Sequence, residues 1–152
     1  MTIARIIAGL ALALGLLDAA AAPADELMPM DISSVDPDML KSMHGPWVIT
    51  DQSGDKRCKV VLTDEPTIGG SVIDVDPDCA KVFPVMADIA AWRLMESWGI
   101  DLADAERKTR IRFTTPDDAY VAQPETDGIF TILQPKESQS LRQGSVRERE
   151  RP

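Results

Sequence analysis

The chain is poor in the residues on which most enzyme sites depend. Its 152 residues include one histidine, His44, two cysteines and one tyrosine. A single histidine excludes zinc sites built on two or three imidazole ligands from the same chain. No serine or cysteine stands in a recognisable nucleophile motif, and the many carboxylates single out no catalytic pair. The sequence therefore predicts a protein that is not an enzyme, with His44 in a structural or surface role.

Long apolar runs are also scarce. Residues 6–17 form an unbroken run of apolar residues and glycine, between Arg5 and the small residues 19–22. The run is shorter than the roughly 20 residues that cross a bilayer, and the Ala-x-Ala pattern after it suits signal peptidase. We expect residues 1–24 to be a cleaved signal peptide that exports the protein to the periplasm, with a retained anchor as the alternative. No later segment is apolar enough to span a membrane.

The two cysteines, Cys58 and Cys79, both follow this leader. Exported proteins form disulfides readily, and two cysteines allow one pairing. Closing a loop of about 22 residues stabilises a domain by about 3 kcal/mol in the chain-entropy description. We predict a Cys58–Cys79 disulfide, with two free buried thiols as the alternative.

Acidic residues dominate the folded part of the chain. The net charge is −9, and residues 25–134 hold 10 Lys and Arg against 21 Asp and Glu. Such a domain repels phosphate backbones and anionic lipid, so nucleic-acid binding is disfavoured. Residues 135–152 hold few apolar side chains and are predicted to be a disordered polar tail. The chain then divides into the leader, an extended segment at 25–36, a domain at 37–134, and the tail.

Most of the domain is predicted to be short β-strands separated by turn residues. Their spacing of roughly 8–12 residues is typical of a small antiparallel barrel or sandwich. The eight candidates are Trp47–Thr50, Cys58–Leu62, Ser71–Val75, Ile89–Leu94, Gly99–Leu102, Arg110–Thr114, Ala119–Ala122 and Ile129–Leu133. The fold class is therefore all-β, and alternation along Arg110–Thr114 places Ile111 and Phe113 inside with the arginines outside.

Two short helical turns are predicted to interrupt the strands. Asp36-Pro37-Asp38 combines an N-cap, a proline at the first helical position and an acid near the positive end of the helix dipole. This turn should run to about Met43, with Val35 and Leu40 at the positions of a hydrophobic staple. Residues 76–78 repeat the Asp-Pro-Asp pattern before Cys79. The second turn should end at Pro84.

The three tryptophans are assigned by their positions in this pattern. Trp47 and Trp92 lie within predicted strands and are expected in the barrel core. Trp98 lies beside a turn and is expected to be the exposed ring. Residues 74–78 resemble the start of a calcium loop, but Cys79 replaces the required glycine and Val85 the bidentate glutamate. We therefore predict no metal site and no cofactor.

From about Pro37 to Leu133 the chain resembles the bacterial inhibitors of serralysin-type zinc metalloproteases, the alkaline proteinase inhibitor family. An outer-membrane lipoprotein branch belongs to the same superfamily. The order and spacing of several short motifs carry the resemblance: Gly45-Pro46-Trp47, Cys58, Cys79, Ala90-Ala91-Trp92-Arg93, Ile100-Asp101-Leu102, Tyr120 and Asp127-Gly128.

The resemblance implies an eight-stranded barrel with one disulfide and a periplasmic role. Members of that family inhibit a secreted protease by inserting their N-terminal segment into its cleft, with the amino terminus near the zinc of the protease. Counting back from Trp47, the inhibitory segment here would be Ser33, Ser34 and Val35. Cleavage near residue 24 leaves about eight residues before Ser33, which departs from the family pattern. The implied partner is a serralysin-type zinc metalloprotease, and the inhibitor is expected to be a monomer.

A second function of a different class fits the same residues. An acidic barrel with an exposed Trp98 suits a non-inhibitory protein of the cell envelope that binds a small ligand or another envelope protein. A gene for a serralysin-like protease beside this one would favour the inhibitor.

Overall fold

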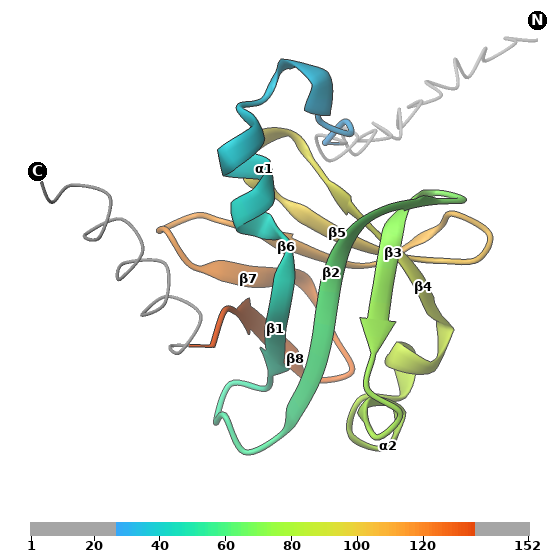
Figure 1. Cartoon of the computed structure of the whole chain (residues 1–152). Helices are drawn as coiled ribbons and strands as arrows, with labels where there is room; N and C mark the ends of the chain where they lie inside the picture. The colour runs from blue at the N-terminus through green and yellow to red at the C-terminus, as the bar shows by residue number, and fades with distance from the viewer. Residues whose placement is uncertain (1–26, 136–152) are drawn as a thin grey trace, which may run out of the picture.

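The computed structural model describes residues 27–135, which form a closed barrel of eight antiparallel strands (Figure 1). Each strand pairs with the next in the sequence, and β8 pairs with β1 to close the ring. The strands are β1 (Gly45–Thr50), β2 (Arg57–Thr67), β3 (Gly70–Val75), β4 (Ile89–Leu94), β5 (Ile100–Asp104), β6 (Thr109–Thr114), β7 (Tyr120–Thr126) and β8 (Ile129–Leu133). The predicted all-β barrel is confirmed. The predicted signal peptide and residues 136–152 of the predicted tail lie outside the described residues.

Alternation along the strands builds the core. In β2 the buried residues are Cys58, Val60 and Leu62, while their neighbours Lys59 and Val61 are exposed. Side chains two residues apart share one face of a strand, so this pattern directs every second residue of the first half of β2 inward, while residues 64–67 are all exposed. Along β6, Ile111 and Phe113 are buried as the sequence predicts, and Trp47 and Trp92 are each only 4% exposed within the same cluster.

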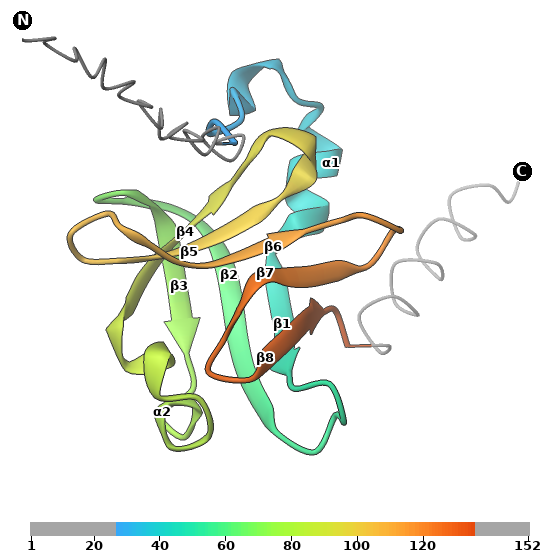
Figure 2. The ribbon, with the colours of Figure 1, turned by 180° about the vertical axis from the view of Figure 1, so that it is seen from behind.

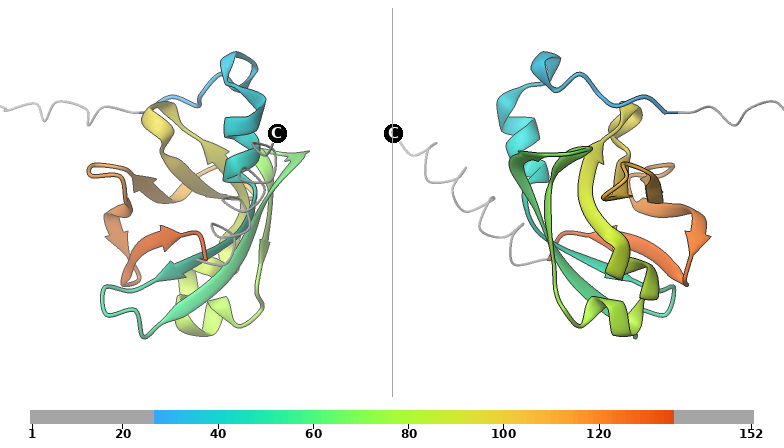
Figure 3. Two further views of the ribbon diagram at one scale, coloured as in Figure 1. Left: turned by 60° about the vertical axis from the view of Figure 1, so that its left-hand side comes forward. Right: turned by 90° about the vertical axis from the view of Figure 1, so that its right-hand side faces the viewer.

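The short helices lie at the two ends of the barrel (Figures 1 and 3). Helix α1 (Pro37–Met43) begins at its predicted cap, Asp36. Helix α2 (Cys79–Val82) begins later than the predicted Asp76 cap, although the Asp76 carboxylate accepts a hydrogen bond from the Asp78 N–H at 2.9 Å. A 3-10 helix, η2 (Pro84–Asp88), follows at once.

The predicted disulfide is confirmed. Cys58 in β2 and Cys79 at the start of α2 are bonded, their Cα atoms are 4.8 Å apart, and both are buried. The bond holds α2 to β2 at the end of the barrel away from α1 (Figure 1). In the chain-entropy description, this cross-link restricts the unfolded chain across a sequence separation of 21.

Strand β5 departs from simple alternation, because all five of its residues are buried. Ile100 and Leu102 belong to the core, whereas Asp101 points to the other face and is 0% exposed. Arg93 on β4 and Arg112 on β6 occupy the register positions beside Asp101 and cover it. Of the two arginines predicted outside the barrel, Arg112 therefore lies over a buried carboxylate, and Arg110 pairs with Asp88 and Asp104. Trp98, predicted to be exposed, is half-buried and packs against the core.

Candidate functional site

Residues 27–36, which precede α1, cross one end of the barrel. Met28, Pro29 and Met30 attach this segment to the barrel. The Met30 N–H donates a hydrogen bond to the Leu94 carbonyl at 3.0 Å, and the Glu96 N–H donates to the Met28 carbonyl at 2.9 Å. Pro29 and Met95 form the antiparallel bridge between these bonds. Figure 2 shows the β4–β5 hairpin reaching this segment, with the 3-10 helix η3 (Glu96–Trp98) in its turn. The segment thus adds one bridge to the end of β4.

A tight turn follows, formed by the 3-10 helix η1 (Ile32–Ser34). The Asp31 carboxylate accepts hydrogen bonds from the Ser33 hydroxyl at 2.6 Å and from the Ser33 N–H at 3.0 Å. These two bonds favour the ionised carboxylate and lower the pKa of Asp31. The Ser34 hydroxyl donates to the Asp31 carbonyl at 2.7 Å. Both serines stay exposed while their hydroxyls fix the turn.

Helix α1 anchors the far side of this turn. The Asp36 carboxylate accepts hydrogen bonds from the Asp38 N–H at 2.8 Å and the Met39 N–H at 3.3 Å, which satisfies two donors at the helix start. Leu40 packs against the core, and Val35 before the cap is half-buried. The predicted staple between Val35 and Leu40 stays a prediction.

The end of α1 is clamped to the barrel wall. The Trp47 indole N–H donates to the Met43 carbonyl at 2.8 Å, and the Gln134 side-chain amide donates to the Ser42 carbonyl at 2.7 Å. The Tyr120 hydroxyl lies 3.7 Å from the Met43 sulfur, and its ring meets Trp47 edge-on. Burial raises the pKa of Tyr120 because the charged phenolate would lose its hydration. Helix α1 is therefore a rigid base for the turn.

The sequence-predicted inhibitory residues lie together in this turn. Ser33 and Ser34 are exposed and Val35 is half-buried. The segment predicted as extended at 25–36 instead contains the η1 turn, because the carboxylate of Asp31 competes for the backbone N–H two residues on. An aspartate two residues before a serine is a signal for such a turn. The bridge to β4 has no comparable sequence signal.

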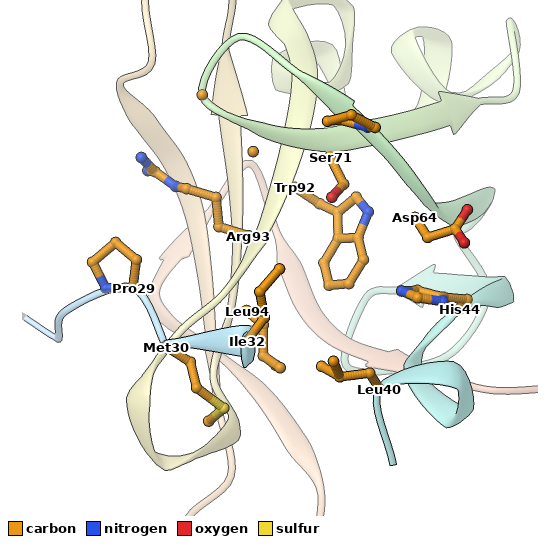
Figure 4. A pocket seen from close by; sticks show the side chains of 13 residues that line it. Pro29, Met30, Ile32, Leu40, His44, Asp64, Ser71, Trp92, Arg93 and Leu94 are labelled. Carbon is orange, nitrogen blue, oxygen red and sulfur yellow. The ribbon is translucent and has the colours of Figure 1, made fainter. Parts of the chain in front are cut away.

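A groove of about 540 Å³ opens beside this segment (Figure 4). Its wall is formed by the residues before α1, by α1 and His44 after it, by the β2–β3 hairpin and by β4. Most of the side chains in this wall are apolar. The residues that line it are Pro29, Met30, Ile32, Leu40, His44, Asp64, Pro66, Gly69, Gly70, Ser71, Trp92, Arg93 and Leu94. The His44 and Trp92 rings meet edge-on within it, with centroids 5.9 Å apart. His44 thus has a packing role at the base of the groove.

Within residues 27–135, no three potential ligands among His, Cys, Asp and Glu gather into a metal site. No helix in the same range is long and apolar enough to cross a membrane.

Comparison with known proteins adds a family assignment. No curated protein matches the chain. The family described as "Protease inhibitor Inh" matches residues 38–134, which include most of α1 and the whole barrel. This range covers more than half of the chain and begins just after the Ser33–Val35 turn. The match extends over the whole of the closed eight-stranded barrel and includes both cysteines of its disulfide. The chain therefore belongs to the Inh family of protease inhibitors.

Proposed function

We propose that this protein inhibits a secreted zinc metalloprotease of the serralysin type by inserting the turn at Ser33, Ser34 and Val35 into the cleft of the protease. It would act in the periplasm as a monomer. Family membership supports inhibition of a protease, and the exposed turn between two fixed anchors supports the mode of action. That turn is the observation that carries the proposal.

Preorganisation is the physical reason why the turn suits inhibition. Each flexible side chain that becomes ordered on binding makes the free energy of binding less favourable by about 0.5–1.5 kcal/mol. Here the hydroxyls of Ser33 and Ser34 are already bonded to Asp31, and α1 is already fixed to the barrel. The protease would meet a segment that has lost this freedom before binding.

The residues before Ser33 decide which form enters the cleft. In this structure Met28 and Met30 are held by two backbone hydrogen bonds, one with Glu96 and one with Leu94 at the end of β4. A second proteolytic trimming to Ser33 would remove that attachment and create an amino terminus at the turn. An untrimmed chain would present the same residues as a loop. Both routes use the same three residues, so one deletion series tests them.

The series consists of proteins that begin at residues 25, 33 and 36, assayed against a serralysin-type zinc protease from the same organism. The form that begins at Ser33 lacks Asp31, so the bonds that preorganise the turn are absent from it. It should inhibit as well as or better than the longer form if its new amino terminus reaches the zinc of the protease, and less well if the turn held by Asp31 carries the affinity. The form that begins at Asp36 keeps the helix cap, the disulfide and the barrel, so it is the matched control for folding. It should melt like the others and fail to inhibit. Equal inhibition by the Asp36 form would refute the role of the turn.

The groove supports a second candidate function. A volume of about 540 Å³ lies within the usual range for small-molecule sites, and the wall is mainly apolar with a few polar groups. A non-inhibitory envelope barrel would use this groove for a small apolar ligand. If the exported protein and the Ser33 form both fail to inhibit, a change in tryptophan emission on adding a fatty acid tests this alternative, because Trp92 lines the groove.

A further inference from the structure

The tip of the β2–β3 hairpin presents an apolar side chain to solvent. Ile68 is 72% exposed, more than any other large apolar side chain in the described part of the chain. It precedes Gly69 and Gly70, whose φ angles of 90° and 152° lie in the region that favours glycine. The hairpin thus turns at a glycine pair and leaves Ile68 at its outermost point.

This tip is packed against β4 and the β5–β6 turn. A Cβ added to Gly69 would lie 2.8 Å from the Cγ of Arg107, and one added to Gly70 would overlap the Trp92 carbonyl. Only glycine permits these approaches, so the hairpin lies closely against the stem of Arg107 and the backbone of β4. Ile68 therefore stands on a supported turn, and burying it on binding would cost little backbone entropy.

Arg107 lies in the β5–β6 turn, and that turn is also well fixed. The Asp104 carboxylate accepts hydrogen bonds from the N–H groups of Glu106 at 3.0 Å and Lys108 at 2.9 Å, and the Asp104 carbonyl accepts from the Arg107 N–H. Arg110 and Arg112 on the next strand are paired with carboxylates. Within residues 27–135, by contrast, no carboxylate lies within ion-pair distance of Arg107. We call Ile68 and Arg107 together the hairpin rim.

The hairpin rim borders the same groove as the proposed inhibitory segment. Ile32, directly before Ser33, lines the groove (Figure 4), and Gly69 and Gly70 of the β2–β3 hairpin line it as well. A protein that receives the turn at Ser33 and also covers this groove would reach the β2–β3 hairpin. Ile32 is itself 58% exposed, so apolar surface is available at this groove as well as at the hairpin rim.

We propose that the hairpin rim is a second docking element for the protease, separate from the inserted turn. It would contact an apolar side chain with a neighbouring carboxylate on the protease surface beside the cleft. The inference rests on the proposed function and goes beyond it, because it assigns affinity to the barrel as well as to the turn. The positive charge of Arg107 would speed association, since the net negative charge of this protein would otherwise repel an acidic surface on the protease.

The test compares four full-length mature variants with the parent, using a serralysin-type zinc protease from the same organism. Ile68→Ser and Arg107→Glu alter the hairpin rim. Val61→Ser and Lys59→Glu are the matched controls, because both residues are exposed on β2 and line a different hollow, near Pro135. Inhibition constants, association rates at two salt concentrations and melting temperatures are measured for all five proteins.

Ile68→Ser should raise the inhibition constant about tenfold, mainly through faster dissociation, as is usual for interface variants. Arg107→Glu should slow association roughly fivefold at low salt, with a smaller effect at about 0.5 M salt because screening shortens the reach of its charge. Both should melt with the parent, and both controls should inhibit like it. Unchanged inhibition by both rim variants, with a parent that inhibits, overturns the docking role and leaves the proposed function intact. A parent that does not inhibit overturns both.

Discussion

Asp101 is the residue whose replacement tests the energetics of this barrel most directly. Its carboxylate is fully buried and accepts two hydrogen bonds from Arg112, both at 2.8 Å, and one from the Thr109 hydroxyl at 2.8 Å. Arg93 approaches the same carboxylate to 3.8 Å. The change Asp101→Asn keeps the volume of the side chain but removes its charge. One carboxylate oxygen becomes an NH₂ group, which places a donor against donors.

The expected loss follows from these contacts. Removing one member of a buried ion pair costs about 3–5 kcal/mol, because the other charge is left without a partner. The Arg112 side chain is 23% exposed, so water can take over part of its hydrogen bonding. We therefore expect Asp101→Asn to lower the free energy of unfolding by about 2–4 kcal/mol, a value reduced from the buried-pair range. For a domain of this size the melting temperature should fall by roughly 10–20 °C.

Urea unfolding followed by tryptophan fluorescence measures this loss. Asp74→Asn is the matched control, because Asp74 is exposed on β3, and it should change stability by less than about 0.5 kcal/mol. A double-mutant cycle with Arg112→Met should show strong coupling, since each single change already removes the pair. A loss below about 1 kcal/mol for Asp101→Asn, or additive single changes, would refute the assignment of the pair as a main stabilising contact of β4, β5 and β6.

Three further outcomes are expected. Replacing Cys58 and Cys79 with Ser should lower stability by about 2–4 kcal/mol, and thiol labelling of the unfolded, unreduced protein should detect no free cysteine. Trp92→Ala should cost about 3–5 kcal/mol and lose the 2.9 Å indole bond to the Thr63 carbonyl; melting within a degree or two of the parent would contradict this. Tyr120 is the single tyrosine, so absorbance at 295 nm reports its raised pKa directly. Because the unfolded chain releases this proton at a lower pH than the folded chain, stability should fall as the pH rises above about 10. A Tyr120 titration midpoint that is the same in urea as in the native protein would contradict the burial of this side chain.

Local signals were enough to predict most of the fold. Period-two patterns such as Cys58–Leu62 and Arg110–Thr114 specify both a strand and its buried face. The Asp36-Pro37-Asp38 pattern fixes the start of α1, because capping depends on neighbouring residues only. The disulfide followed from the cysteine count and the leader. Each of these features is determined by a few adjacent residues or, for the disulfide, by the number of cysteines.

Features that depend on contacts between strands were not predictable in the same way. Asp101 reads as the polar member of an alternating strand, and its burial requires Arg93 and Arg112 at matching registers on β4 and β6. Trp98 lies beside a turn, yet its ring packs back onto the core. The attachment of Met30 to β4 uses backbone groups alone, which carry no sequence signal. In each case the partner lies on another strand, and only the closed barrel brings it close.

The two attachments of the proposed inhibitory turn differ in strength, and this asymmetry suits the proposed entry of the turn into a cleft. Met28 and Met30 contribute two backbone hydrogen bonds to the barrel, each worth about 0.5–1.5 kcal/mol net. Helix α1 is held instead by buried groups, including the indole bond of Trp47. We expect the Met30 amide to exchange with solvent well before the Trp47 indole N–H in hydrogen-exchange NMR, because the first attachment opens locally. Equal protection of the two groups would mean that the segment before the turn is as firmly held as the helix after it, and that insertion requires prior trimming.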